Sequence, residues 1–200
     1  MTPPNRQTIA GQVYLDLRRL AQITGRATDE LLQLYALEGF LDRLTRSDQR
    51  DHFVLKGGVL LAAYDARRAT RDIDFAARAL ANDIDTMIET VRAIIDVHLD
   101  DGLSYDPDSL RAQIIREDND YRGVRITATA QLATARLHFH LDINIGDPIW
   151  PEPTILDGYT ALAQPRWTAW RRNQRLETTT PADFANLLQP VIAYVDALLA

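Results

Sequence analysis

Apolar residues recur every three or four positions in the first part of the chain. Within residues 7–24 this stripe consists of Ile9, Val13, Leu17, Leu20 and Ile23. Gly25 interrupts it, and a second stripe follows Thr28, where Asp29 and Glu30 are typical of a helix start. Because this spacing gathers apolar side chains on one helical face, it predicts two amphipathic helices before any strand.

Shorter apolar runs then predict a sheet. Strands are expected at residues 53–55, 73–75, 110–116, 124–130 and 137–145, with a helix at about 83–99 and a short one at 59–64. The last strand alternates strictly: its odd positions from Leu137 to Ile145 are apolar, and the positions between them are His138, His140, Asp142 and Asn144. These elements predict an α+β fold, in which helices flank a mixed β-sheet.

The end of the chain differs from this domain. Residues 146–165 are rich in proline and turn-forming residues, which is typical of a loop or linker. A short helix is expected at 167–176, and Thr180-Pro181 favours the start of a final helix. We therefore divide the chain into a domain of residues 1–147 and a linker with a helical tail, residues 148–200. Trp167 and Trp170 lie beside arginines, so they either pack the tail on the core, which we favour, or stack on bases.

Composition narrows the class of protein. The chain has 46% hydrophobic residues, a net charge of −6 and no cysteine. Disulfides and thiolate metal sites are excluded, and an acidic chain does not coat nucleic acids in general. Neither a signal peptide nor an apolar run long enough to span a membrane is found, so we expect a cytoplasmic protein without a membrane partner.

Acidic residues on two predicted strands indicate a metal site. Asp72 and Asp74 are two positions apart, so their side chains leave the same face of a strand. Taken alone, such a pair is also typical of a solvated strand face. Asp142 adds a third carboxylate on the polar face of the last strand. Three oxygen ligands on neighbouring strands would suit Mg²⁺, with other positions left for water and phosphate.

A glycine pair precedes these acids. Gly57 and Gly58 follow the first predicted strand, and Lys56 before them is the only lysine of the chain. Glycine lets backbone N–H groups approach a phosphate, although a Gly-Gly pair is also common in plain turns.

Together these pieces resemble the signature of the nucleotidyltransferase superfamily. More closely, the segments 53–58 and 68–75 resemble the AbiEii/MenT-type toxins of bacterial toxin–antitoxin systems, over residues 25–147 and again from Trp167. The resemblance implies transfer of a nucleotide from a nucleoside triphosphate to RNA, with tRNA 3′ ends as acceptors, and a cognate antitoxin as partner. It also assigns roles to the candidate residues: Asp72, Asp74 and Asp142 as catalytic residues that hold Mg²⁺, and Lys56, Gly57, Gly58, Arg68, Thr70 and Arg71 as nucleotide-binding residues.

One departure from the family leaves an alternative open. Relatives carry a later lysine and a later aspartate in their helical half, whereas this chain has no lysine after Lys56. The alternative is a truncated, catalytically weak relative that serves as a binding or regulatory module.

Overall fold

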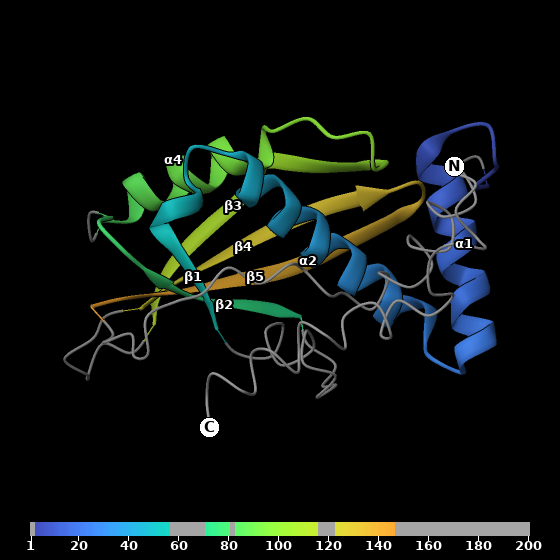
Figure 1. Ribbon diagram of the computed structural model, residues 1–200, viewed down its shortest axis with the longest axis horizontal. Helices are drawn as coiled ribbons and strands as arrows, with labels where there is room; N and C mark the ends of the chain where they lie inside the picture. Colours follow the sequence, from blue (N-terminus) through green and yellow to red (C-terminus); the bar gives the residue numbers. More distant parts are fainter. Residues whose placement is uncertain (1–2, 57–70, 81–82, 116–122, 147–200) are drawn as a thin grey trace, which may run out of the picture. The chain divides into compact units, whose positions relative to one another are not determined.

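The computed structural model describes residues 3–56, 71–80, 83–115 and 123–146. All of them belong to one compact unit, Met1–Gly158. Its elements are α1 (Ile9–Thr24), α2 (Thr28–Arg46), a 3₁₀ turn η1 (Arg50–His52), β1 (Phe53–Lys56), β2 (Asp72–Ala77), α4 (Ile84–Ile95), β3 (Leu103–Ile115), β4 (Gly123–Leu132) and β5 (Ala135–Ile145). The predicted α+β fold with a mixed sheet is confirmed (Figure 1).

The five strands form one sheet in the order β1-β2-β5-β4-β3. β2 runs parallel to β5, while the other neighbouring strands are antiparallel. A tight turn joins β4 to β5: Leu132 pairs with Ala135, and Ala133 between them has a positive φ of 51°. This turn determines which residues of β4 and β5 face each other.

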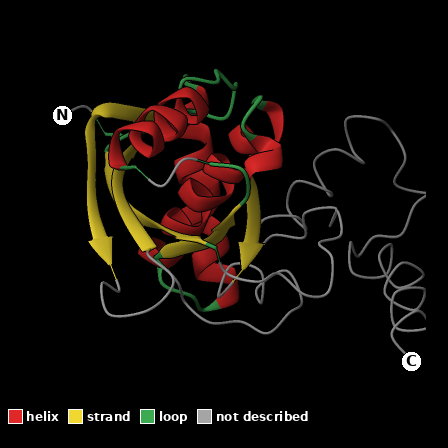
Figure 2. Cartoon of the chain, turned by 90° about the vertical axis from the view of Figure 1, so that its left-hand side faces the viewer, coloured by secondary structure: helices red, strands yellow, loops and turns green. Residues whose placement is uncertain are grey.

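The described helices gather on one side of the sheet (Figure 2). Phe40 of α2 contacts two strands, with ring centroids 6.4 Å from Phe75 on β2 and 5.9 Å from Phe139 on β5. The residues that alternate with polar positions on β5, Leu141 and Ile143, are fully buried. Burial of this apolar face fixes the opposite direction for the polar side chains of the same strands.

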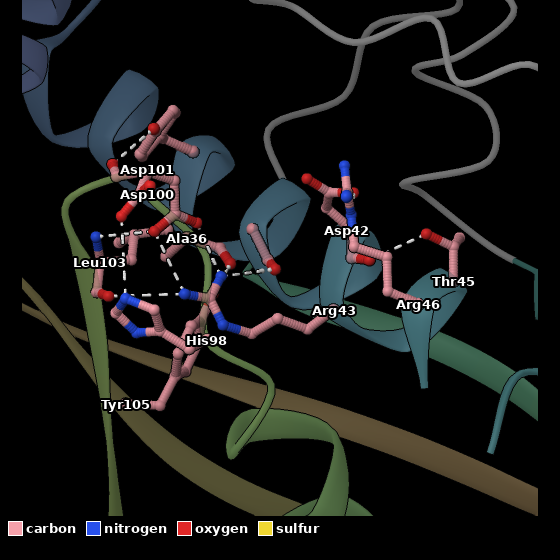
Figure 3. Close-up of polar contacts among 12 residues, drawn as sticks. Ala36, Asp42, Arg43, Thr45, Arg46, His98, Asp100, Asp101, Leu103 and Tyr105 are labelled. Atoms are coloured by element: carbon pink, nitrogen blue, oxygen red, sulfur yellow. Dashed lines mark hydrogen bonds and ion pairs between the residues drawn. The ribbon is translucent and has the colours of Figure 1, made fainter. Parts of the chain in front are cut away.

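A buried arginine ties α2 to β3 and to the segment before it (Figure 3). Arg43 donates from Nη1 and Nη2 to the two carboxylate oxygens of Asp101, at 2.7 and 3.1 Å. Its guanidinium lies 4.7 Å from the ring centroid of Tyr105, whose hydroxyl donates to the Ala36 carbonyl at 2.7 Å. Burial acts to lower the pKa of Arg43, but the hydrogen bonds with Asp101 and nearby charges raise it overall. Arg43 therefore stays charged inside the domain.

The bounds of β3 and α4 differ most from the predicted ones. β3 begins at Leu103 rather than 110, and its pairing with β4 is interrupted between Asp106 and Arg111. An edge strand tolerates Pro107 at such an irregularity, although Asp-Pro-Asp suggests a turn in the sequence. α4 ends at Ile95 rather than 99. The predicted helix at 59–64, the linker and the tail lie outside the described residues.

Candidate functional site

Four charged residues form a line across the polar face of the sheet. Lys56 on β1 pairs with Asp74 on β2, Asp74 pairs with Asp142 on β5, and Asp142 pairs with Arg125 on β4. Residues that pair across strands project to the same face, so these four side chains are successive neighbours. We call Lys56, Asp74, Asp142 and Arg125 the charged row. Its two cations flank its two carboxylates.

Asp72 adds a third carboxylate beside the charged row. It lies two residues before Asp74 on the same face of β2, because Ile73 and Phe75 are buried on the helical side. Its partner on β5 is His140, whose backbone N–H donates to the Arg71 carbonyl at 3.2 Å. The structure thus brings Asp72, Asp74 and Asp142 to one face on adjacent strands.

Arg125 binds both oxygens of the third carboxylate. Its Nε donates to Oδ1 of Asp142 at 2.7 Å, and its Nη2 donates to Oδ2 at 2.6 Å. The side chain of Asp142 is only 12% exposed and that of Arg125 is 34% exposed. The hydrogen bonds to Asp142 raise the pKa of Arg125, and the charges of Asp142, Asp72 and Asp74 raise it further. Arg125 is therefore a permanent cation within the electrostatic reach of all three acids.

The remaining sequence-predicted residues are only partly described. Lys56 is half-buried at the end of β1, and Arg71 is exposed just before β2. Gly57, Gly58, Arg68 and Thr70 lie outside the described residues. The nucleotide-binding role of these residues therefore stays a prediction.

The donor set suits magnesium in its chemistry. Asp72 and Asp74 supply oxygen ligands from one strand face, which leaves coordination positions for water and phosphate. Over residues 3–56, 71–80, 83–115 and 123–146, however, the structure has no group of three or more His, Asp or Glu residues close enough together to hold a metal ion. Instead, Arg125 engages Asp142 at both oxygens. Asp72 and Asp74 thus supply two carboxylates on one strand face, and the third, Asp142, is engaged by Arg125 at both oxygens.

Two histidines border the site on β5. The Nδ1 atom of His140 lies 3.2 Å from the Thr127 hydroxyl, and that of His138 lies 3.0 Å from the Thr129 hydroxyl. Both pairs bridge β5 and β4 on the face that carries Asp142. Each threonine orients its histidine.

Arg125 is the site residue that the sequence analysis missed. A signal for it exists, because Arg125 and Asp142 are equally distant from the turn between β4 and β5. The turn itself was hard to detect: its first residue is Ala133, whereas glycine or asparagine usually marks such positive-φ turns.

None of the helices in the described part of the chain is both long and apolar enough to cross a membrane.

Comparison with known proteins gives one family match and two structural similarities. Residues 39–184 match the family model described as "Nucleotidyl transferase AbiEii toxin, Type IV TA system". A search of curated proteins gave no match. Two Helicobacter pylori crystal structures are similar: a "putative nucleotidyltransferase" (16% identity, TM-score 0.40, 67% of this chain and 53% of that chain) and JHP933 (15% identity, TM-score 0.41, 67% and 52%). The chain thus spans about half the length of these two proteins.

Proposed function

Since the chain belongs to the AbiEii nucleotidyltransferase toxin family of type IV toxin–antitoxin systems, we propose that it transfers a nucleotide from a nucleoside triphosphate to RNA. The acceptor that we propose is the 3′ end of tRNA, and the partner is a cognate antitoxin. The observation that carries the proposal is that Asp72, Asp74 and Asp142 share one face of two adjacent strands. Carboxylate oxygens are the ligands that hold the Mg²⁺ which assists nucleotide transfer.

In the proposed reaction the hydroxyl oxygen of the RNA end attacks the α-phosphorus of the triphosphate. A new phosphodiester bond forms, the bond between the α-phosphorus and the bridging oxygen breaks, and pyrophosphate leaves. Asp72 and Asp74 would hold Mg²⁺, which supplies neutralisation of the developing negative charge. Asp142, the third carboxylate, would complete the ligand set or accept the proton of the attacking hydroxyl.

Basic and small residues would bind the triphosphate. Lys56 belongs to the charged row and pairs with Asp74 across the strands, so it lies beside the proposed reaction centre. Gly57 and Gly58 directly follow it in the sequence, and Arg68, Thr70 and Arg71 precede Asp72. Positive charge and backbone N–H groups at these positions would stabilise phosphate oxygens.

The experiment is incubation of the purified chain with each labelled nucleoside triphosphate, Mg²⁺ and total tRNA. We expect label in tRNA with at least one of the four triphosphates, and loss of that label when EDTA removes the metal. Incubation with 5S ribosomal RNA tests whether the acceptor is tRNA. Absence of labelled RNA with all four triphosphates would contradict the proposal.

A second candidate function rests on the absence of a later lysine. The chain has no lysine after Lys56. A catalytically weak binding or regulatory module would bind triphosphate or antitoxin without labelling RNA. Triphosphate binding in the absence of transfer therefore separates the two candidates.

A further inference from the structure

The pair of Asp142 and Arg125 has a geometry that a general surface ion pair lacks. Both hydrogen bonds are short, both carboxylate oxygens are used, and Asp142 is almost buried. Such a two-point contact is stronger and more directional than a single bond. It keeps the carboxylate in one orientation and neutralises it.

On its other side, Asp142 pairs with Asp74. Adjacent strands are about 4.8 Å apart, and two carboxylates at that spacing repel each other unless a cation compensates them. Arg125 provides that compensation in the structure. A divalent cation bound by Asp74 and Asp142 would provide it equally well.

The Arg125 guanidinium and a divalent cation cannot both bind the Asp142 carboxylate at full strength. Arg125 occupies one lone-pair direction at each oxygen, and its charge reduces the attraction of the carboxylate for another cation. We propose that Arg125 is a positioning residue which competes with a divalent cation for the Asp142 carboxylate. This inference rests on the proposed function, because that function supplies the divalent cation.

In this arrangement Asp142 coordinates the cation fully, together with Asp72 and Asp74, when it separates from Arg125. The guanidinium released in this way remains a positive charge beside the site. Its Nη1 group takes no part in the two bonds to Asp142, and all its N–H donors then become available to a substrate phosphate.

The test is calorimetric titration of the full chain with Mn²⁺ alone, without nucleotide or RNA. Arg125→Gln removes the competitor, so we expect Mn²⁺ to bind at least about tenfold more tightly than in the wild type. The double variant Arg125→Gln/Asp142→Asn has the net charge of the wild type. Its affinity should return to within about threefold of the wild type, because the freed carboxylate is gone.

Two further variants serve as controls. Arg111→Gln causes the same charge change on β3, two strands from Asp142, and should leave Mn²⁺ affinity unchanged. Arg125→Lys keeps the charge but not the two-point contact, so its gain should be smaller than that of Arg125→Gln. If Arg125→Gln does not fold without metal, thermal melting of Arg125→Lys with and without Mn²⁺ replaces the titration, and its stabilisation by Mn²⁺ should exceed that of the wild type.

An unchanged or weaker Mn²⁺ affinity in Arg125→Gln would overturn the inference. So would a gain that persists in the double variant, because the gain would then come from charge alone. The transfer assay tests the proposed function independently. If the wild type labels RNA but Arg125→Gln does not bind Mn²⁺ more tightly, only this inference is refuted. If the wild type labels no RNA but Arg125→Gln binds Mn²⁺ more tightly, only the proposed function is refuted.

Discussion

Asp74 lies directly beside Asp142 where β2 runs parallel to β5, and each carboxylate has a cation as its other neighbour in the charged row. The flanking cations offset the repulsion between the two carboxylates when no metal ion is bound. The electrostatic environment of each of the four side chains also includes the charge of its neighbour in the row. Substitutions in the row should therefore affect chemistry and stability in different directions.

We expect Asp72→Ala and Asp74→Ala each to reduce nucleotide transfer at least about a hundredfold, because each removes a proposed metal ligand. Metal-free thermal stability should stay equal or rise, since fewer carboxylates repel one another. Transfer of labelled nucleotide and melting by circular dichroism measure the two effects. Asp108→Asn, at an exposed acid of β3, is the control and should keep full activity. Full activity of either alanine variant would show that its assigned role is wrong.

The buried pair of Arg43 and Asp101 should contribute more to the free energy of unfolding than an exposed ion pair on the same helix. Arg43→Met leaves Asp101 without its cation, and breaking a buried pair costs about 3–5 kcal/mol. Urea unfolding should show this loss as a lower free energy of unfolding. Arg46→Ala is the matched control on the same helix: its pair with Asp42 is exposed, so its removal should cost about 0.5 kcal/mol or less. Equal losses in both variants would contradict the importance of burial.

Tyr105 should make the domain sensitive to alkaline pH. Burial raises the pKa of its hydroxyl well above the ordinary value of about 10. Above about pH 10 the hydroxyl of Tyr105 loses its proton in the unfolded chain but keeps it in the folded chain. The contribution of Tyr105 to the free energy of unfolding is therefore complete below about pH 10 and falls as pH rises. Tyr105→Phe loses the hydrogen bond to Ala36, which costs about 1 kcal/mol at pH 8. Urea midpoints at pH 8 and 11 should show this difference between wild type and variant shrinking. A constant difference would contradict the argument.

Gly102 and Gly25 form a matched pair for testing a close backbone approach. Both have positive φ, 76° and 68°, so alanine is strained at either position. A Cβ at Gly102 would also lie 2.6 Å from the Ala10 Cα atom of α1, whereas a Cβ at Gly25 meets nothing within 4 Å. We expect Gly25→Ala to cost about 1 kcal/mol and Gly102→Ala about 1–3 kcal/mol more. Denaturant unfolding of both variants measures the difference. Equal losses in the free energy of unfolding would show that the close approach of Gly102 to Ala10 does not contribute.

The sequence allowed the helices and the directions of the three acids to be predicted, for identifiable reasons. α1 and α2 carry continuous apolar stripes with clear boundaries at Gly25 and Thr28. The strict alternation on β5 determines the face of Asp142 without knowledge of its neighbours. Local periodicity was sufficient in each case.

Pairing between strands was not predictable in the same way. The neighbour of Asp142 depends on a turn whose Ala133 gives no sequence signal, so Arg125 was not recognised. The first part of β3 was missed because Pro107 argues against a strand, and only its position at the sheet edge permits it. Both features depend on tertiary context.

The tight turn between β4 and β5 also bears on the order in which the site assembles during folding. A hairpin with so short a loop closes within microseconds, whereas parallel pairing of β2 with β5 must close a long stretch of chain. We expect pulsed hydrogen exchange to find the β4–β5 amides protected before those of β2, and simultaneous protection would contradict this order. Asp142 would then meet Arg125 before Asp74 arrives, so the guanidinium would shield the hairpin from the repulsion of the incoming strand. The same ion pair would thus lower an electrostatic barrier to the last step of sheet formation.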